Sequence, residues 1–317
     1  MNPLDEQVAA LVGLSVEEVR RIAHRSPTTY RIYQVPKRSG TGYRVIHHPW
    51  KQTKMLQYAL MLLLNPSLVP HSAAMAFRSG VSSPLRINAE RHAKSAYLVR
   101  LDFEDFFPSI VPDDLFERLA APTNPTPLAL TDIDYDFLRH VFFVRKSTGD
   151  YSLPIGAPSS PMISNGVMFD MDVSLLDLAT KLEFTYTRYA DDLVFSSNRK
   201  RASKQLVKQV AALLRKSKHP KLKINALKTR FMSRNCRRAV TGLLITPDGR
   251  VSIGREHKRR IRGLLSRRIN GKLNEEEKAS LQGWLAYVLD VEPEFFNRLC
   301  QKYSAEKVNE ALKRAQA

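Results

Sequence analysis

Two adjacent aspartates, Asp191 and Asp192, interrupt a run of strand-forming residues between Glu183 and Ser196. The Tyr, Thr, Val and Phe residues of this run favour a pleated, half-buried surface, and short polar side chains suit a tight turn. The pattern therefore predicts a β-hairpin that carries both carboxylates at its turn. Two carboxylates held together between apolar strands repel one another, and a bound cation would relieve that repulsion.

A second acidic cluster favours a chemical role for the hairpin, although an isolated Asp-Asp pair is more often ordinary turn chemistry. The apolar run at 96–101 ends in Asp102, and Glu104 and Asp105 follow closely. This run predicts a buried strand whose last residue emerges at a sheet edge. If the strand neighbours the hairpin, three carboxylates converge. That arrangement suits two Mg²⁺ ions about 3.5–4 Å apart, which clamp the oxygens of a phosphoryl transfer.

Four motifs carry a resemblance to a known family. The segments 189–192 (Tyr-Ala-Asp-Asp) and 101–107 (Leu-Asp-Phe-Glu-Asp-Phe-Phe) resemble the two catalytic motifs of reverse transcriptases. The segment 88–92 (Asn-Ala-Glu-Arg-His) fits the Asn-Ala-x-x-His pattern of bacterial retron reverse transcriptases, and 240–242 fits their Val-Thr-Gly signature. The chain therefore resembles the retron enzymes over nearly its whole length.

This resemblance implies an RNA-directed DNA polymerase with an α+β, right-hand polymerase fold of fingers, palm and thumb. The palm would be an antiparallel sheet with flanking helices at residues 96–245. The thumb would be a helical, RNA-binding block at residues 246–317. The fingers would comprise residues 1–95, with residues 113–152 returning to them.

The resemblance also implies roles for individual residues at the catalytic centre. Asp102 and Asp191 would hold both Mg²⁺ ions, with Asp192 as a weaker or indirect ligand. Phe107 would pack under the sugar of the incoming deoxynucleoside triphosphate (dNTP) and exclude a 2′-hydroxyl. The alternative is that Phe106 and Phe107 are both core residues, and at least one of them is expected to be.

Four basic side chains are predicted to contact substrate or template. Lys37 and Arg44, in a Gly-rich basic hairpin, can both meet the phosphate oxygens of a triphosphate. Lys228 matches a family lysine near the triphosphate, and Arg78 belongs to a family motif near the template. For the hairpin cations and for Lys228, a solvated surface charge is the alternative interpretation.

Positive charge is concentrated after the acidic hairpin. The chain has 50 Lys and Arg residues and 31 Asp and Glu residues, a net charge of +19. Residues 1–198 hold 20 of the basic and 21 of the acidic residues, whereas residues 199–317 hold 30 and 10. A basic surface of this size indicates a polyphosphate partner such as nucleic acid. A surface serving only solubility would not need this asymmetry.

The segment 255–269 predicts a basic amphipathic helix within this region. Ile261, Leu264, Leu265 and Ile269 form one apolar stripe. The basic residues that lie largely elsewhere, and that we expect to bind the backbone of a nucleic acid, include Lys258, Arg259, Arg262 and Arg267. An RNA-containing duplex is A-form, so shape and phosphate contacts should dominate its recognition.

Further patterns outline the remaining elements. They predict helices at 1–26, 49–64, from 84, 136–144, 162–178, 200–216, 281–289 and 295–312, and strands at 30–35, 43–46 and 240–243. Within the first of these segments, Ser15 and Glu18 have capping-box spacing. The loop at 153–161 leads into a helix and can offer backbone N–H groups to phosphate. Ile155 stands in this loop where many reverse transcriptases carry Gln, so no side-chain hydrogen bond to nucleotide is expected there. His92 is expected to be a hydrogen-bonded structural residue.

Targeting signals and a disulfide framework are not expected. The chain lacks an apolar run of 18 or more residues, which predicts no membrane span. Residues 1–20 include acids and lack a basic signal-peptide segment. Cys236 and Cys300 have no paired spacing, which favours a reducing compartment over a disulfide or zinc framework. A cytoplasmic protein is the resulting prediction.

Retron enzymes recognise a structured noncoding RNA encoded beside them, and the resemblance implies the same partner here. They prime from the 2′-hydroxyl of a guanosine and make a branched RNA–DNA molecule (msDNA) that acts in antiphage defence, usually with an effector or toxin protein. One alternative is another bacterial reverse transcriptase, related to group II introns or to diversity-generating elements. A second is a protein that acts mainly as an RNA-binding scaffold for an effector. The intact acidic triad argues against a purely structural role.

Overall fold

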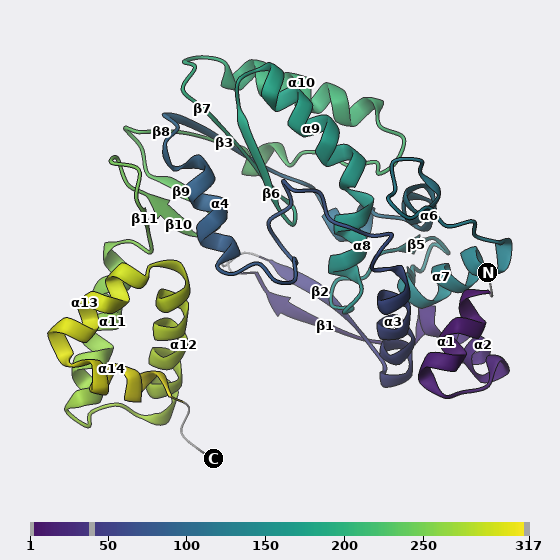
Figure 1. Ribbon diagram of the computed structural model, residues 1–317, viewed down its shortest axis with the longest axis horizontal. Helices are drawn as coiled ribbons and strands as arrows, with labels where there is room; N and C mark the ends of the chain where they lie inside the picture. Colours follow the sequence, from purple (N-terminus) through teal and green to yellow (C-terminus); the bar gives the residue numbers. More distant parts are fainter. Residues whose placement is uncertain (1–2, 38–41, 314–317) are drawn as a thin grey trace.

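An antiparallel sheet lies at the centre of the computed structural model, which describes residues 3–37 and 42–313 (Figure 1). Its strands follow the order β6-β7-β3-β8. Their bounds are Tyr97–Asp102 for β3, Thr185–Tyr189 for β6, Asp192–Ser197 for β7 and Arg230–Ser233 for β8. Strand β3 therefore lies beside the β6–β7 hairpin, as the acidic motifs predicted.

Both faces of the sheet are buried along β3 and β7, whereas the edge strand β8 is exposed or partly exposed. Successive residues of a strand point to opposite sides, so Leu101 and Phe195 enter one hydrophobic core, whereas Leu98 and Val194 enter a second one. A sheet with two apolar faces needs other elements on each side to exclude water. The rest of the chain divides between these two tasks.

The first core joins the sheet to helices and to the N-terminal elements. Its helices are α1 (Leu4–Val12), α2 (Val16–Arg25), α3 (Lys51–Leu64), α6 (Pro112–Ala120), α7 (Asp132–Phe142), α8 (Ser160–Val167), α9 (Phe169–Lys181) and α10 (Ser203–Lys216). Shorter elements beside them are η1 (Ser26–Thr28), β1 (Tyr30–Pro36), β2 (Tyr43–Pro49), α5 (Phe106–Ser109), β4 (Val144–Arg145) and β5 (Tyr151–Ser152). Helices α1, α2 and α3 all contact α7, so residues beyond 130 return to the N-terminal elements.

The second core joins the opposite face to the C-terminal elements. These are α4 (Pro84–Ala93), η2 (Ala226–Lys228), β9 (Arg238–Val240), β10 (Leu243–Ile245), β11 (Val251–Ser252), α11 (Arg255–Ile269), α12 (Glu275–Val291), α13 (Pro293–Tyr303) and α14 (Ala305–Leu312). All except η2 contribute side chains to, or border, the second core. Strands β9 and β10 share buried residues with α11–α14, so the packing is continuous across the domain boundary predicted at 245/246.

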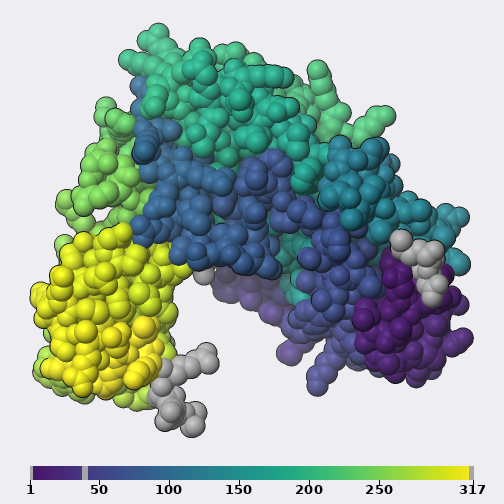
Figure 2. Space-filling model, viewed as in Figure 1, coloured from purple at the N-terminus to yellow at the C-terminus, as the bar shows by residue number. Residues whose placement is uncertain are grey.

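The C-terminal helices are anchored to α4 and enclose a hollow with the N-terminal elements. The hydroxyl of Ser83 donates to the backbone carbonyl of Asp290 at 2.9 Å, and Arg86 forms an ion pair with Glu294 at 3.0 Å. Figure 2 shows the hollow between the yellow C-terminal helices and the purple N-terminal elements. Such a hollow beside the sheet is where a long substrate can enter.

Several predicted elements are confirmed, whereas the helical segments predicted at 1–26, 162–178 and 295–312 each contain two helices. Ser15 and Glu18 form the expected capping box of α2. The helix predicted at 162–178 is instead two helices, α8 and α9, which meet at Met168. The helix predicted at 136–144 starts at Asp132, because Thr131 caps it.

Two hairpin turns also differ from the predictions. The strand expected at 240–243 is the turn between β9 and β10, with Thr241 at φ +48° and Gly242 at φ +86°. Positive φ at both central residues is typical of tight hairpin turns. In the acidic hairpin the turn residues are Ala190 and Asp191, whereas Asp192 is already the first residue of β7.

Among residues 3–37 and 42–313, the structure has no helix with the length and apolarity needed to cross a lipid bilayer.

Gly166 allows α8 to pack directly on Leu68. A Cβ at Gly166 would lie 2.6 Å from Leu68 Cδ2 and 3.2 Å from its Cα. We expect Gly166→Ala to lower the free energy of unfolding by about 1–3 kcal/mol, the usual cost of overpacking a core. The matched control is Gly263→Ala, because no atom lies within 4 Å of a Cβ at that helical position. Chemical denaturation of both variants tests this, and equal stabilities would contradict it.

Candidate active site

Three carboxylates meet at one end of the central sheet. Asp102, the last residue of β3, lies opposite Asp192 in the register of β3 and β7. Asp191 precedes it in the turn, and the N–H of Phe103 donates to the Asp191 carbonyl at 3.1 Å. The convergence predicted from the sequence is therefore present, and it depends on the pairing of β3 with the hairpin.

Burial and repulsion by neighbouring carboxylates make Asp191 and Asp192 hard to ionise. Burial raises the pKa of the Asp191 carboxyl, and the nearby Asp102 raises it further. Burial raises the pKa of Asp192 to about 6, with Arg100 lowering it and Asp191 and Asp102 raising it. A nearby positive charge stabilises the ionised form of such carboxyl groups.

A positive charge already lies against one of these carboxylates. The ammonium of Lys228, at the end of η2, donates to Asp102 Oδ1 at 2.6 Å. Asn225 positions this lysine, because its side-chain oxygen accepts the backbone N–H groups of Leu227 and Lys228. The prediction that Lys228 lies at the site is thus consistent with its position beside Asp102.

The chemistry of the carboxylates suits hard divalent cations. In the described part of the chain, no three His, Cys, Asp or Glu side chains are already arranged to hold a metal ion. The fit rests instead on oxygen donors that repel one another and that attract the ammonium of Lys228. Oxygen donors of this kind are the ligands that Mg²⁺ prefers.

A buried ion pair supports the turn that carries Asp191. Ala190 has φ +55°, a left-handed conformation that is costly for a residue with a Cβ. Arg188 Nη1 donates to the Ala190 carbonyl at 3.1 Å and to Asn165 at 3.1 Å. Arg188 and Asp172 are both 0% exposed and form an ion pair at 2.6 Å. These side chains were not singled out from the sequence, although a charged residue inside an apolar strand is a signal of such a pair.

A second network ties both strands of the hairpin to α4. The two ring nitrogens of His92 each lie 2.7 Å from a hydroxyl: Nδ1 from that of Ser196 on β7, and Nε2 from that of Thr187 on β6. The Thr187 hydroxyl donates to Asn88 Oδ1 at 2.6 Å. The Asn-Ala-x-x-His motif therefore places Asn88 and His92 where they hold the hairpin, which agrees with the structural role expected for His92.

The basic hairpin β1–β2 faces the carboxylates from the N-terminal side. Arg44 lies opposite Val35, and its charge lowers the pKa of Asp191. Lys37 is exposed and its N–H donates to the Gly42 carbonyl, while residues 38–41 of the predicted basic turn lie outside the described residues.

A cavity of about 610 Å³ adjoins this hairpin. Its lining includes Arg44, Asp105 and Ile155. Two further basic residues in the lining, Arg145 and Lys146, were not predicted from the sequence. The short β4–β5 hairpin brings them there, and nothing in their local pattern indicates this position.

Phe107 and Arg78 are both partly buried. Phe106 is buried and stacks on Phe103 with ring centroids 5.6 Å apart, whereas Phe107 is only half-buried against the core. This confirms that at least one of the two phenylalanines is a core residue. Arg78 Nη1 donates to the carbonyls of Ser72 and Ala74, each at 3.4 Å, so the guanidinium lies against its own loop.

The four basic residues predicted on α11 differ in their environments. Lys258 forms an ion pair with Glu292, and Arg267 forms one with Glu277 at 2.7 Å. Arg262 is exposed and lies over the ring of Phe295 at 5.1 Å. Arg259 is exposed. Arg259 and Arg262 are therefore better placed than the other two to contact an external phosphate.

Comparisons with known proteins identify the class. The family described as reverse transcriptase (RNA-dependent DNA polymerase) matches residues 35–263. The apo telomerase of Candida tropicalis shares the fold, with 14% identity and a TM-score of 0.51 over 91% of this chain. This chain spans 56% of the length of that telomerase. The chain is thus an RNA-directed DNA polymerase with a right-hand polymerase fold, and enzymes of this family use divalent metal ions.

Two relatives define the group more closely. The chain is 36% identical over 312 residues to the retron Ec73 reverse transcriptase of Escherichia coli, covering 96% of this chain and 94% of that protein. It is 32% identical over 292 residues to the retron Ec83 reverse transcriptase of Escherichia coli, covering 91% of each. The chain belongs to the bacterial retron reverse transcriptases.

His92 should make folding sensitive to acid. Burial lowers the pKa of His92 to about 3, whereas an unfolded histidine titrates near 6.5. The unfolded chain therefore binds this proton first, and stability falls as the pH drops below 6.5. Between about pH 7 and 5.5, we expect a loss of about 1 kcal/mol in the free energy of unfolding. Urea denaturation of the wild type and of His92→Gln measures this loss, which the variant should lack; parallel pH profiles would contradict it.

Proposed function

We propose that the protein copies part of a structured noncoding RNA into single-stranded DNA and yields a branched RNA–DNA molecule, msDNA, used in antiphage defence. The observation that carries the catalytic part is the register of β3 on β7, which sets Asp102 opposite Asp192 beside Asp191. The membership of the retron family supports the biological part. The partners would be the cognate noncoding RNA, its msDNA product, dNTPs and an effector or toxin protein.

The three carboxylates would hold two Mg²⁺ ions, with Asp102 and Asp191 as ligands of both and Asp192 as the weaker ligand. When bound, the ions would supply positive charge to the in-line transfer of a nucleotide and to the pyrophosphate that leaves. Lys228 would neutralise Asp102 before they bind and would then be free to face the triphosphate. Its half-exposed side chain supports this exchange of partners.

The remaining substrate contacts would come from both sides of the carboxylates. Lys37 and Arg44 would bind triphosphate oxygens from the β1–β2 hairpin, and the electrostatic effect of Arg44 on Asp191 supports this placement. Phe107 would lie under the sugar of the dNTP, which its incomplete burial permits. Arg78 would lie near the template strand.

The proposed domain division has fingers at 1–95 and 113–152, a palm at 96–245 and a thumb at 246–317. The thumb would grip the RNA or the RNA–DNA duplex by its backbone, through Arg259 and Arg262 and less directly through Lys258 and Arg267. The excess of basic residues after residue 198 supports this function. The protein would act on its RNA in the cytoplasm. The two cysteines, Cys236 and Cys300, lack paired spacing, which supports a reducing compartment.

The catalytic assignment can be tested with Asp191→Asn. We expect DNA synthesis to fall on the order of a thousandfold or more, because charge stabilisation supplies most of the rate of phosphoryl transfer. Nucleic acid that copurifies with each protein, expressed from its native locus, is sequenced. The wild type should carry short single-stranded DNA joined to a structured RNA, and the variant should carry the RNA without DNA.

Circular dichroism and RNA affinity serve as the controls for this variant, and both should match the wild type. Synthesis near the wild-type rate would overturn the metal-site assignment. Wild-type protein that carries RNA but no DNA would instead overturn the proposed msDNA product while leaving RNA binding intact.

The thumb contacts can be tested through salt dependence. Replacing Arg259 and Arg262 by Gln should weaken RNA binding and flatten the slope of log K against log salt by about one unit per lost phosphate contact. Arg21→Gln, on the N-terminal helix α2, is the matched control and should leave the slope unchanged. Filter binding at several salt concentrations measures all three slopes. An unchanged slope in the double variant would show that these side chains are only solvated.

A further inference from the structure

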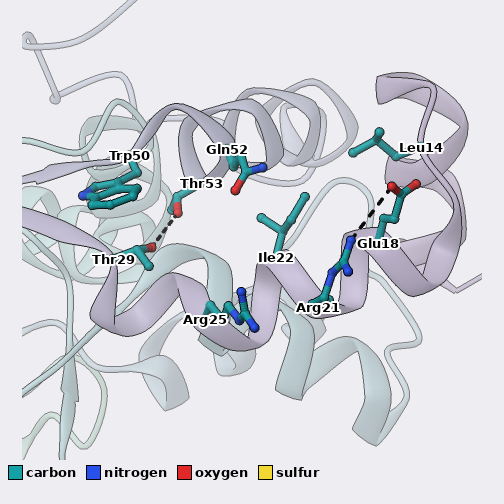
Figure 3. A pocket seen from close by; sticks show the side chains of 9 residues that line it. All are labelled: Leu14, Glu18, Arg21, Ile22, Arg25, Thr29, Trp50, Gln52 and Thr53. Atoms are coloured by element: carbon teal, nitrogen blue, oxygen red, sulfur yellow. Dashed lines mark hydrogen bonds and ion pairs between the residues drawn. The ribbon is translucent and has the colours of Figure 1, made fainter.

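A cleft with a volume of about 320 Å³ lies between α2 and α3 (Figure 3). The segments 14–29 and 50–53 supply its lining, so none of the three carboxylates belongs to it. Leu14 and Ile22 provide apolar surface, and the indole of Trp50 stands at one end. The volume lies at the lower end of the range for small-molecule sites, which suits a single planar base.

Trp50 presents an exposed ring on a rigid backbone. The residue is 63% exposed, and its N–H donates to the Thr29 carbonyl at 3.2 Å while its own carbonyl accepts from Lys54 at 2.9 Å. Below the ring, the hydroxyl of Thr53 lies 3.1 Å from those of Ser26 and Thr29, which joins α3 to the end of α2. Within residues 3–37 and 42–313, the indole makes no ring or cation contact. A single exposed apolar residue is common, but a ring held in place in this way loses little freedom when a ligand stacks on it.

Arg25 offers a free cation at the cleft, whereas Arg21 is already paired. Arg21 lies 3.9 Å from Glu18, as the dashed line in Figure 3 shows, and Glu18 also forms the capping box of α2. Arg25 is exposed, and its guanidinium has neither an ion pair nor a hydrogen bond in the part of the chain that the structure describes. Arg25 is therefore available to an external anion.

The surroundings of the cleft also favour an anion. Residues 15–54 include nine Lys or Arg residues and two Asp or Glu residues, although residues 1–198 as a whole are nearly neutral. The first turn of α3 carries Lys51 and Lys54 and no acid, and no described side chain caps it. The positive end of the helix dipole therefore adds to the charge of Arg25. An exposed ring beside such charge is typical of surfaces that bind single-stranded nucleic acid.

We propose that this cleft binds one unpaired nucleotide of a single strand, with its base stacked on Trp50 and its phosphate on Arg25. Stacking combined with a cation along the backbone is the general mode of single-strand binding, and it tolerates any base. Neither contact distinguishes ribose from deoxyribose, so RNA and DNA strands should both bind. The inference extends the proposed function to a strand held outside the catalytic centre, and it rests on that function.

The two tryptophans of the chain permit a direct test. Trp284→Phe leaves Trp50 as the single tryptophan of the full-length chain. Titration with an unstructured RNA strand should quench the Trp50 emission in a saturable way, and a DNA strand of the same sequence should bind within about threefold of the same affinity. A blunt duplex of that sequence should not quench, because its bases are already stacked on one another.

Matched variants in this background assign the contacts. Arg25→Gln should weaken the binding seen by Trp50 at least about threefold and flatten its salt slope by about 0.7 unit, the value for one phosphate of a single strand. Arg21→Gln makes the same change on the same helix and should alter neither quantity, because Arg21 is paired with Glu18.

The ring itself is tested with Trp50→Ala, whose affinity for a labelled strand is measured by anisotropy and should fall at least about fivefold. The control is Tyr58→Ala, since Tyr58 is an exposed aromatic residue of α3 that does not line the cleft. Circular dichroism confirms that each variant is folded.

The proposal is overturned if the duplex quenches Trp50 as strongly as the single strands do, or if Arg25→Gln and Arg21→Gln behave alike. Strands that bind without any change in Trp50 emission also overturn it, and would leave the cleft for an acidic segment of a protein. Any of these results leaves the polymerase assignment standing, because extension of an annealed primer measures that activity separately. Loss of primer extension with intact Trp50 quenching would support the cleft and count against the proposed catalysis instead.

Discussion

The pairing of β3 with the β6–β7 hairpin is the constraint on which the site depends. It sets Asp102 opposite Asp192, although 89 residues separate them in the sequence. A shift of this register by one residue would turn every side chain of β3 to the other face of the sheet. The apolar residues of β3 prevent such a shift, because Leu101 and Leu98 fit two different cores. Packing therefore determines the position of Asp102 relative to Asp192.

The hairpin itself is held by polar groups where apolar packing cannot reach. The Arg188–Asp172 pair supports the left-handed turn at Ala190 from one face, and His92 links both strands to α4 from the other. Removing one member of a buried ion pair typically costs several kcal/mol because the other charge is left uncompensated. Such networks give the carboxylates a rigid support on both sides of the sheet.

The same sheet also joins the acidic hairpin to the basic C-terminal helices. Its second face packs on α4 and the C-terminal helices, so strand β7, which begins at Asp192, shares one core with the basic helix α11. The tight turn at Thr241 and Gly242 and the aromatic residues of α12 meet in the space between them.

The sequence alone determined the two acidic clusters at Asp102 and Asp191, the strand–turn–strand of the hairpin and the basic C-terminal region, because each is expressed in local composition and spacing. It also predicted α2 and α11 through capping and apolar periodicity. Only the tertiary structure decided that 240–243 is a turn, that Arg188 pairs with Asp172, and that Arg145 and Lys146 reach the cavity beside Arg44. The turn depends on the pairing of β9 with β10, and the other two features depend on contacts with other elements, about which a local pattern carries no information.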